Sequence, residues 1–376
     1  MSEDIKLFVS CHKLDTHIPD NALLQPIQVG AALAASRMPN LLHDDEGDSI
    51  SEKNRSYCEL TGQYWAWQNT DADYYGFLHY RRYFNFSKTE YPIHHEPFIF
   101  GDVTFDRNDD ETLQRIDFNE EAMRKVITAH DFIAPEPIEA LEKTTVYEQY
   151  RDSFGHHIED LDTVMDNIRL KYPDIWPSAQ KYLNQTKVYV CNMFVMRREL
   201  FRAYSAFLFD VLSTHEKMRD FSHYSPVARR VSGYLGERIC GMYLTYLYDK
   251  GYDGIDLQRV YFRNTDDGQR PATATGTTGE IETLNFDATV RGPGKIYSAI
   301  GTSLRRLAVP HQLDHVRRQA GSCEGRTGRQ RPGRGVSHRR AISDGVRERG
   351  GRGWTHARAG FQNVQQASRA ADVLCQ

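Results

Sequence analysis

The chain has 376 residues, of which 40% are hydrophobic and 11% aromatic, and its formal net charge is −4. This length and apolar content suffice to bury the core of one large domain or two small ones. Averaged over the whole chain, the small net charge argues neither for nucleic acid nor for an acidic partner, and we expect no nucleic acid partner, although charge is unevenly distributed along the chain. No apolar run approaches the length of a membrane-spanning helix, about 18 residues or more.

The cysteines and the N-terminus indicate the compartment. The cysteines, no two of which form a CxxC pair, are Cys11, Cys58, Cys191, Cys240, Cys323 and Cys375. An isolated Cys in an apolar run usually behaves as a small buried hydrophobic residue. The first residues, MSEDIKLFVSCHK, lack the charged and apolar segments of a secretory signal. We therefore expect reduced thiols and a cytoplasmic protein.

Short apolar runs predict strands, and apolar residues at helical spacing predict helices. In chain order, the predicted elements are a strand at 5–10, helices at 23–35 and 56–69, strands at 74–79 and 131–134, helices at 159–171 and 176–183, a strand at 187–196, helices at 199–212 and 226–250 (the latter one helix or a pair) and a strand at 255–262. This alternation predicts an α/β fold with a largely parallel sheet. Ligands of such sheets bind beyond the carboxyl ends of the strands.

A change of composition near residue 264 predicts three regions. Residues 1–263 have the regular strand and helix patterns and the many aromatic residues of a globular domain. Residues 264–309 are predicted to be a polar linker with a partly ordered extension. Residues 310–376 are crowded with Arg and Gly, and Trp354 and Phe361 are their only large aromatic residues. Burial of so little apolar surface does not offset the conformational entropy that the chain loses on folding. We therefore expect this tail to be disordered.

Three interpretations of the tail stay open. The first, which we favour, is a shifted reading frame, because translation of a GC-rich gene in another frame yields an Arg- and Gly-rich sequence without lysine such as this one. The second is a natural tail that binds RNA or an anionic membrane. The third is a small domain of unrecognised type.

Residues 74–84, YYGFLHYRRYF, contain six aromatic residues and end an apolar strand with His79, Tyr80, Arg81 and Arg82. Adjacent guanidinium groups suit a diphosphate, because each presents a fixed fork of donors and keeps its charge at any working pH. The alternative is a surface arginine pair beside a core tyrosine. The density of aromatic residues favours a binding site.

Several separated motifs resemble one family. They are ISEKNRSYCELTGQYWAWQN, DADYYGFLHYRRYF, HHIEDLDTV, NMFVMRRELF and SPVARRVSGYLGER. Together they resemble a bacterial glycosyltransferase-like family, of domain-of-unknown-function type, from capsule and exopolysaccharide gene clusters. The resemblance covers about residues 4–262. It implies a single Rossmann-like, GT-A-type fold and transfer of a hexosyl group from a nucleotide diphosphate sugar.

The same resemblance implies a glycan or lipid-linked glycan as acceptor, in the assembly of capsule, exopolysaccharide or O-antigen. We therefore expect a cytoplasmic enzyme that contacts the inner face of the plasma membrane peripherally. A non-catalytic module that binds a nucleotide sugar or a glycan is the alternative, because the same aromatic, arginine-bearing cleft would bind without turnover.

The resembled enzymes hold a divalent metal, Mn²⁺ or Mg²⁺, with a DxD motif after a comparable strand. Here His79, Tyr80 and Arg81 occupy that place, while Asp71 and Asp73 precede the strand and read as a solvated turn. Cationic side chains can neutralise a departing diphosphate as a metal does. We therefore hypothesise a metal-independent enzyme, with His79 as one catalytic candidate.

Asn192, Glu237 and Arg238 complete the candidate centre. In the resembled enzymes an Asn at the Asn192 position contacts the donor sugar; the alternative is a buried Asn satisfied by the backbone. Glu237 would orient the acceptor hydroxyl or act as the general base that an inverting transferase needs, with an ordinary salt bridge as the alternative. Gly233 and Gly236 permit close backbone approach there.

Two further groups are predicted to bind the donor. Residues that follow the first strand would contact the nucleotide base and ribose: Ser10, His12 and Lys13. Residues at a predicted helix start would present donors to the ribose or diphosphate, with a capping box as the alternative: Ser51, Glu52, Asn54 and Tyr57. His156, His157 and Asp160 have near metal-ligand spacing, but adjacent helical residues face different ways, so we expect no zinc site.

Overall fold

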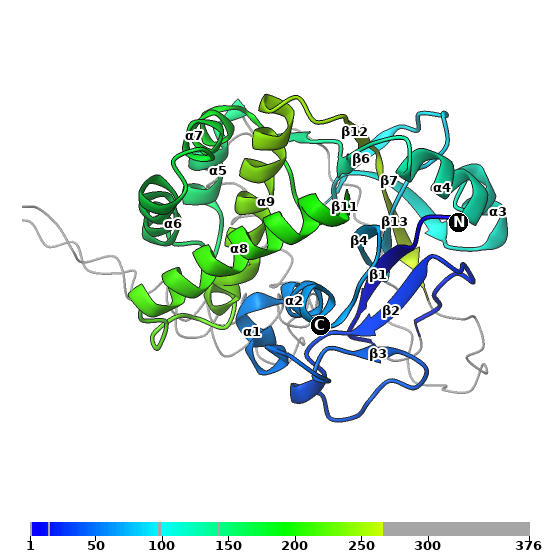
Figure 1. Cartoon of the computed structure of the whole chain (residues 1–376), viewed down its shortest axis with the longest axis horizontal. Coiled ribbons are helices and arrows are strands. Elements are labelled where there is room, and N and C mark those ends of the chain that lie inside the picture. Colours follow the sequence, from blue (N-terminus) through cyan, green and yellow to red (C-terminus); the bar gives the residue numbers. More distant parts are fainter. Residues whose placement is uncertain (1, 14–15, 97–98, 141–142, 266–376) are drawn as a thin grey trace, which may run out of the picture. The chain divides into compact units, whose positions relative to one another are not determined.

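A computed structural model describes residues 2–13, 16–96, 99–140 and 143–265. The predicted linker and extension, apart from its first two residues, and the whole predicted tail lie outside these described residues. The three-region organisation therefore stays a prediction. The described part of the chain folds around a central sheet with helices on both faces (Figure 1).

The strands are β1 (Ile5–Cys11), β2 (Leu24–Gln28), β3 (Leu42–His43), β4 (Tyr74–His79), β5 (Arg82–Phe84), β6 (Ile93–Glu96), β7 (Ile99–Arg107), β8 (Phe132–Pro135), β9 (Ile138–Glu139), β10 (Lys187–Val188), β11 (Phe194–Arg197), β12 (Gly254–Leu257) and β13 (Arg259–Asn264). The helices are η1 (Ala31–Leu33), η2 (Ser51–Lys53), α1 (Asn54–Tyr57), α2 (Leu60–Asn69), α3 (Asp110–Arg115), α4 (Glu120–Ile127), α5 (Val146–Asp152), α6 (Ile158–Lys171), α7 (Trp176–Asn184), α8 (Arg198–Met218), η4 (Ala228–Arg230) and α9 (Val231–Asp249).

The pairing of the strands gives the order β3–β2–β1–β4–β11–β8–β12 across the central sheet. β1 is parallel to both β2 and β4, while β11 is antiparallel to its neighbours β4 and β8. At His79 and Arg82 the chain turns from β4 into β5, which continues the sheet through β13, β7 and β6. The predicted α/β fold, a largely parallel sheet flanked by helices, is confirmed.

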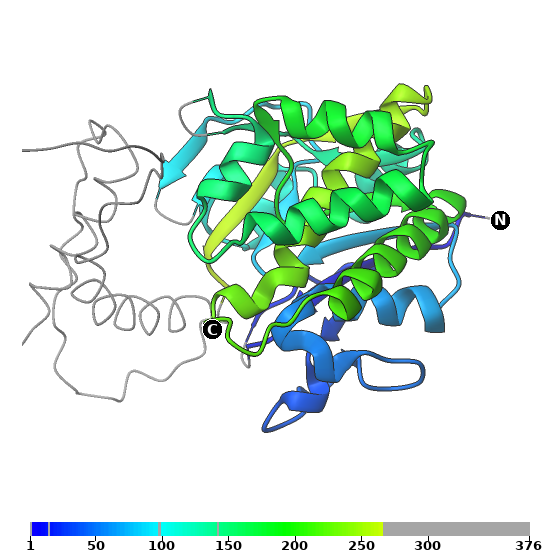
Figure 2. The ribbon, with the colours of Figure 1, turned by 90° about the vertical axis from the view of Figure 1, so that its left-hand side faces the viewer.

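Alternation along β4 separates the two sides of the core. Tyr75 and Phe77 are buried with α8, while Tyr74 and Leu78 belong to a second cluster that includes Met123 of α4. This is the two-residue period of a strand that is covered on both faces. The helices of residues 146–249, drawn in green shades in Figure 2, form the thicker cover. His79 shares the face of Tyr75 and Phe77, so it points toward that helical layer.

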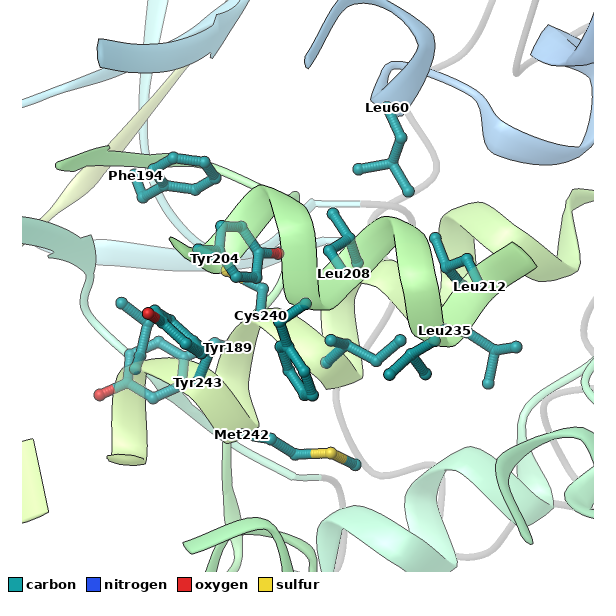
Figure 3. Close-up of a cluster of buried hydrophobic side chains, with 14 of the residues drawn as sticks. Leu60, Tyr189, Phe194, Tyr204, Leu208, Leu212, Leu235, Cys240, Met242 and Tyr243 are labelled. Atoms are coloured by element: carbon teal, nitrogen blue, oxygen red, sulfur yellow. The ribbon is translucent and has the colours of Figure 1, made fainter. Parts of the chain in front are cut away.

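Buried aliphatic and aromatic side chains join α8 to α9. Figure 3 shows Leu208 and Leu212 of α8 beside Leu235 of α9, and all three are fully buried. Burying one such side chain contributes about 1.5–3 kcal/mol relative to exposure. At Gly241 of α9, a Cβ would lie 2.1 Å from the Tyr182 ring of α7. Packing of α7 against α9 therefore requires glycine at this position.

Four predicted elements are wrong in part. Residues 23–35 form β2, a turn and the short 3-10 helix η1 rather than one α-helix, because pairing of Leu24 with Leu7 of β1 outweighs local helix propensity. The single strand expected at 187–196 is two strands, because Cys191 and Asn192 have left-handed backbones, with φ of 76° and 46°. The strand expected at 255–262 is also two, β12 and β13, which pair with different partners.

The helix expected at 56–69 is interrupted at Cys58, where φ is 52°. The start of this region has no capping box, since neither η2 nor α1 has a side-chain cap. The helix expected at 226–250 is one long helix, α9, preceded by the short η4. Cys11, Cys58, Cys191 and Cys240 are free thiols, as expected for the described cysteines.

A fully buried carboxylate, Asp44, holds the loop after β2 against the start of α2. Its oxygens accept hydrogen bonds from the backbone N–H groups of Gly30 (2.8 Å) and Ala31 (2.9 Å) and from the hydroxyls of Ser51 and Thr61 (2.6 Å for Thr61). A buried carboxylate is tolerated only when such partners replace its water. Asp44 therefore fixes the loop at Gly30–Ala31 and the segment from η2 to α2, which follow the carboxyl end of β2.

Asp44→Asn should lower the free energy of unfolding by about 3 kcal/mol or more, because the new NH₂ group faces donors and leaves buried groups unpaired. Urea denaturation of the full chain measures this loss. The matched control is Asp166→Asn, a side chain 66% exposed, which should change stability by less than about 0.5 kcal/mol. Equal effects of the two substitutions would contradict the role given to Asp44.

Candidate functional site

The carboxyl ends of β1, β2 and β4 meet at one edge of the sheet. The carbonyl of Cys11 accepts a hydrogen bond from Val29 N (3.0 Å), and the carbonyl of Ser10 accepts one from Tyr80 N (3.1 Å). The rings of His12 and Tyr80 meet edge to face at 5.1 Å. These contacts bring the predicted nucleotide-binding segment beside the segment that ends β4, although Ser10 itself is buried and His12 and Lys13 are exposed.

His79 ends β4 as a neutral imidazole. Its Nε2 lies 2.8 Å from the carbonyl oxygen of Cys191. A carbonyl only accepts, so Nε2 carries the hydrogen and Nδ1 remains an acceptor. Burial, reinforced by the nearby charge of Arg82, lowers the pKa of His79 to about 4. At neutral pH this residue therefore acts through hydrogen bonds rather than as a cation.

The peptide groups of the Cys191–Asn192 turn are held from several elements. The carbonyl of Cys191 accepts from His79, and its N–H donates to Oε1 of Glu237 of α9 (2.8 Å). Asn192 Nδ2 donates to Oε1 of Glu59 (2.7 Å), at the start of α2. Two successive non-glycine residues in the left-handed region cost about 1–3 kcal/mol each, and such strain is concentrated at functional sites.

Glu237 stands at a small pocket beside this turn. The pocket is a narrow, partly open hollow lined by Pro135, Tyr189, Val190, Asn192, Met193, Glu237, Cys240 and Leu244. The Glu237 side chain is 24% exposed, and its second oxygen lies 3.5 Å from Nη1 of Arg238. An ionised carboxylate has about four acceptor positions, so these two contacts do not use all of its hydrogen-bonding capacity.

Arg238, predicted to bind substrate, is turned inward. Its side chain is 2% exposed, and its Nη2 donates to Oε1 of Gln149 (2.6 Å) of α5. The guanidinium also lies 5.7 Å from the centre of the Tyr150 ring. In this conformation Arg238 orients Glu237 and α5 rather than facing solvent.

The adjacent arginines after β4 differ in environment. Arg82 is 14% exposed and lies 3.6 Å from the buried Asp102, whose other oxygen accepts from Arg259 Nε (2.6 Å). Arg81 stacks on the rings of Tyr80 (5.5 Å) and Tyr261 (5.2 Å) and forms none of the ion pairs found among the described residues. Arg81 is thus the guanidinium available to an external anion. The inner group, with two guanidiniums on one carboxylate, adds net positive charge behind it.

The residues predicted at the helix start lie farther inside than expected. Ser51 is fully buried and hydrogen-bonded to Asp44, and Tyr57 donates to Oε2 of Glu216 (3.2 Å) of α8. Asn54 Nδ2 donates to Cys58 O (2.8 Å) and lies directly against Gly30. Glu52 is exposed. Of this group, Glu52 and the half-buried Asn54 are the residues that a ligand at the ends of β1 and β2 could reach.

The residues with metal-like spacing do not form a metal site. Asp71 and Asp73 lie at the opposite end of β4 from His79 and form ion pairs with Arg198. Asp160 is fully buried and pairs with His215 (3.0 Å) and Arg219. Within the described ranges there is no cluster of three or more His, Cys, Asp or Glu side chains that could hold a metal ion.

Comparison with known proteins assigns this chain to a family. The family model described as "Domain of unknown function (DUF4422)" matches residues 6–248. The chain belongs to the DUF4422 family. This chain is similar to a solved structure, the WbbM bifunctional glycosyltransferase in its apo form, with a TM-score of 0.65 and 30% sequence identity. The match covers 69% of this chain and 46% of WbbM, so this chain spans less than half of that protein.

No curated protein matches this DUF4422 chain. Among the described residues, no helix has both the length and the apolar composition needed to cross a membrane.

Sequence reasoning missed Glu59, the left-handed turn, and the Asp102–Arg259 pair. Asp102 and Arg259 are 157 positions apart and meet only because β13 pairs with β7. Glu59 precedes an ordinary helical pattern, which hides its contact with Asn192. One indication was present: a polar Asn inside the apolar run VYVCNMFVM needs a partner for its amide.

The His79 pKa gives a test of the site. The imidazole should titrate near pH 4 rather than at its ordinary value of 6.5. Protonation then favours the unfolded state, so stability should fall as pH decreases from about 6.5 to about 4, and His79→Gln should reduce this slope. NMR titration of the ring signals, identified by their loss in His79→Gln, measures the pKa. A midpoint above pH 6 would contradict the described environment.

Proposed function

We propose that this protein is a glycosyltransferase that uses a nucleotide diphosphate sugar. The observation that carries the proposal is the meeting of three strand ends, a stacked arginine and a glutamate at one edge of an α/β sheet. The structural similarity to a protein named as a bifunctional glycosyltransferase supports it. Fold similarity alone would not, since one fold hosts many activities.

In the proposed complex the donor lies along the sheet edge. The exposed His12 and Lys13 would contact the nucleoside beside the buried ring of Tyr80, and Arg81 would bind the diphosphate in bidentate fashion. Asn192 would contact the sugar. This order follows the positions of the residues, from the ends of β1 and β4 to the Cys191–Asn192 turn.

The proposed chemistry is a direct, inverting displacement. Glu237 takes the proton from an acceptor hydroxyl while that oxygen attacks the anomeric carbon of the donor sugar. The bond from the anomeric carbon to the diphosphate oxygen breaks, and the nucleoside diphosphate leaves with the bonding electrons. Arg81, with the net positive charge of Arg82, Asp102 and Arg259 behind it, stabilises the charge that develops on the leaving group.

We further propose a glycan or lipid-linked glycan as acceptor and a role in the assembly of a surface polysaccharide. Peripheral contact with the inner face of the membrane belongs to the same proposal. These points rest on the motif resemblance. The chemistry of the site requires only an acceptor hydroxyl that can reach Glu237.

The full chain should release nucleoside diphosphate from at least one member of a nucleotide-sugar panel, by transfer to an added glycan or by slow hydrolysis. Glu237→Gln should lower kcat by about 100-fold or more with little change in donor affinity, because the amide cannot accept the proton. Chromatography of the released nucleotide measures turnover, and calorimetry measures donor binding.

Glu120→Gln, an exposed substitution on α4, is the matched control and should keep full activity. Donor binding without any turnover would favour the non-catalytic module instead. Unchanged kcat in Glu237→Gln would remove this residue from the mechanism.

The arginine-based stabilisation predicts metal independence. Turnover should persist in excess EDTA, while Arg81→Ala should raise the donor KM by at least about 10-fold through loss of the bidentate contact. Initial rates measured with EDTA, with Mn²⁺ and with Mg²⁺ check this. Activity that EDTA abolishes and Mn²⁺ restores would overturn the hypothesis.

A further inference from the structure

The Cys191–Asn192 turn is the point where the proposed catalytic residues are attached to each other. Its carbonyl at Cys191 takes the hydrogen bond of His79, and its N–H at the same residue holds Glu237. The orientation of this one peptide segment therefore sets the positions of both side chains. Any group that fixes the turn acts on the site without touching substrate.

The turn does not hold its own shape. Cys191 and Asn192 both have positive φ, and neither is glycine. Asn tolerates this region better than most residues, but Cys has no such advantage. A backbone of this kind persists only when the surrounding structure over-determines it.

Glu59 supplies a further contact to the turn, from the start of α2. It lies immediately before α2, and its Oε1 accepts from Asn192 Nδ2 at 2.7 Å. The Gly233 carbonyl is a second, longer acceptor at 3.4 Å. The carboxylate makes the first bond charge-assisted, and such bonds are about twice as strong as neutral ones.

The Glu59 carboxylate also fixes which way the amide of Asn192 points. An ionised carboxylate only accepts, so Nδ2 must face it and Oδ1 must face away. Oδ1 lies against Gly236, 3.3 Å from where a Cβ at that position would be, and it has no hydrogen-bond partner within the described structure. Asn192 is 4% exposed and lines the same pocket as Glu237.

We propose that Glu59 is a positioning residue, which acts through the Asn192 amide to hold the Cys191–Asn192 turn and, with it, His79 and Glu237 in place for sugar transfer. This inference rests on the proposed function. It gives the amide a fixed direction, in which Oδ1 is buried against Gly236. It assigns Glu59 no direct contact with the nucleoside or the diphosphate.

The first test compares substitutions of Glu59 in the full chain. Glu59→Leu should lower kcat by about 100-fold, because small displacements of catalytic groups have effects of this size. Glu59→Gln should restore most of the activity, since its Oε1 can still accept from Asn192. The affinity for the nucleoside diphosphate released by the best donor should change by less than about 2-fold, because its contacts lie elsewhere.

The second test asks whether Glu59 acts through the amide. Asn192→Gly keeps a backbone that accepts positive φ but removes the side chain. In that background Glu59→Leu should change kcat by less than about 2-fold, because the two residues belong to one interaction. Glu120→Leu on α4, in both backgrounds, is the control for loss of a glutamate far from the site.

Several outcomes would overturn the inference. Wild-type kcat in Glu59→Leu would do so, as would a full Glu59→Leu effect in the Asn192→Gly background. A parallel loss of nucleoside diphosphate binding and of cooperative unfolding in Glu59→Leu would show a general structural role instead. A wild-type chain that turns over no nucleotide sugar is a failure of the proposed function, which is distinguishable because it precedes any substitution.

Discussion

The parallel pairing of β1 with β4, with Ser10 opposite His79, is the constraint on which the site depends. It places the carboxyl ends of two strands side by side, and the bond from Tyr80 N to Ser10 O extends the pairing one step beyond β4. Because β11 runs antiparallel to β4, its first residues lie beside the last residues of β4. The Cys191–Asn192 turn therefore meets His79, and α9 brings Glu237 to the same place.

The distribution of charge follows from the turn between β4 and β5. Arg82 opens β5 and points inward, where it shares the Asp102 carboxylate of β7 with Arg259 of β13. Arg81, one residue earlier, stays on the aromatic surface of Tyr80 and Tyr261. Buried charges must be paired, whereas a half-exposed guanidinium on an aromatic ring keeps its donors for a ligand. Arg82 is thus engaged within the fold, whereas Arg81 is the arginine proposed to bind the diphosphate.

This edge of the sheet has two other features: a strained backbone at Cys191–Asn192 and an uncharged imidazole at His79. The left-handed turn is maintained by contacts from β4, α2 and α9 rather than by its own sequence. Burial keeps His79 neutral, so the positive charge of the site is carried by guanidinium groups whose charge does not depend on pH. Such a site can stabilise a developing anion without reorganising, which is the electrostatic requirement of group transfer.

The sequence by itself determined the α/β class, most of the long helices and the strand at 74–79, because these depend on local periodicity and burial. It also determined that a polar Asn in an apolar run, and an Arg pair after a strand, call for partners. Only the tertiary structure decided which partners they have. Strand pairing made residues 24–28 a strand and gave Arg82, but not Arg81, the Asp102 carboxylate as a partner. Packing of α2 brought Glu59 to Asn192 across 133 positions of chain. Such contacts join residues far apart in the sequence. The local sequence around each residue therefore does not show which distant residue it will contact.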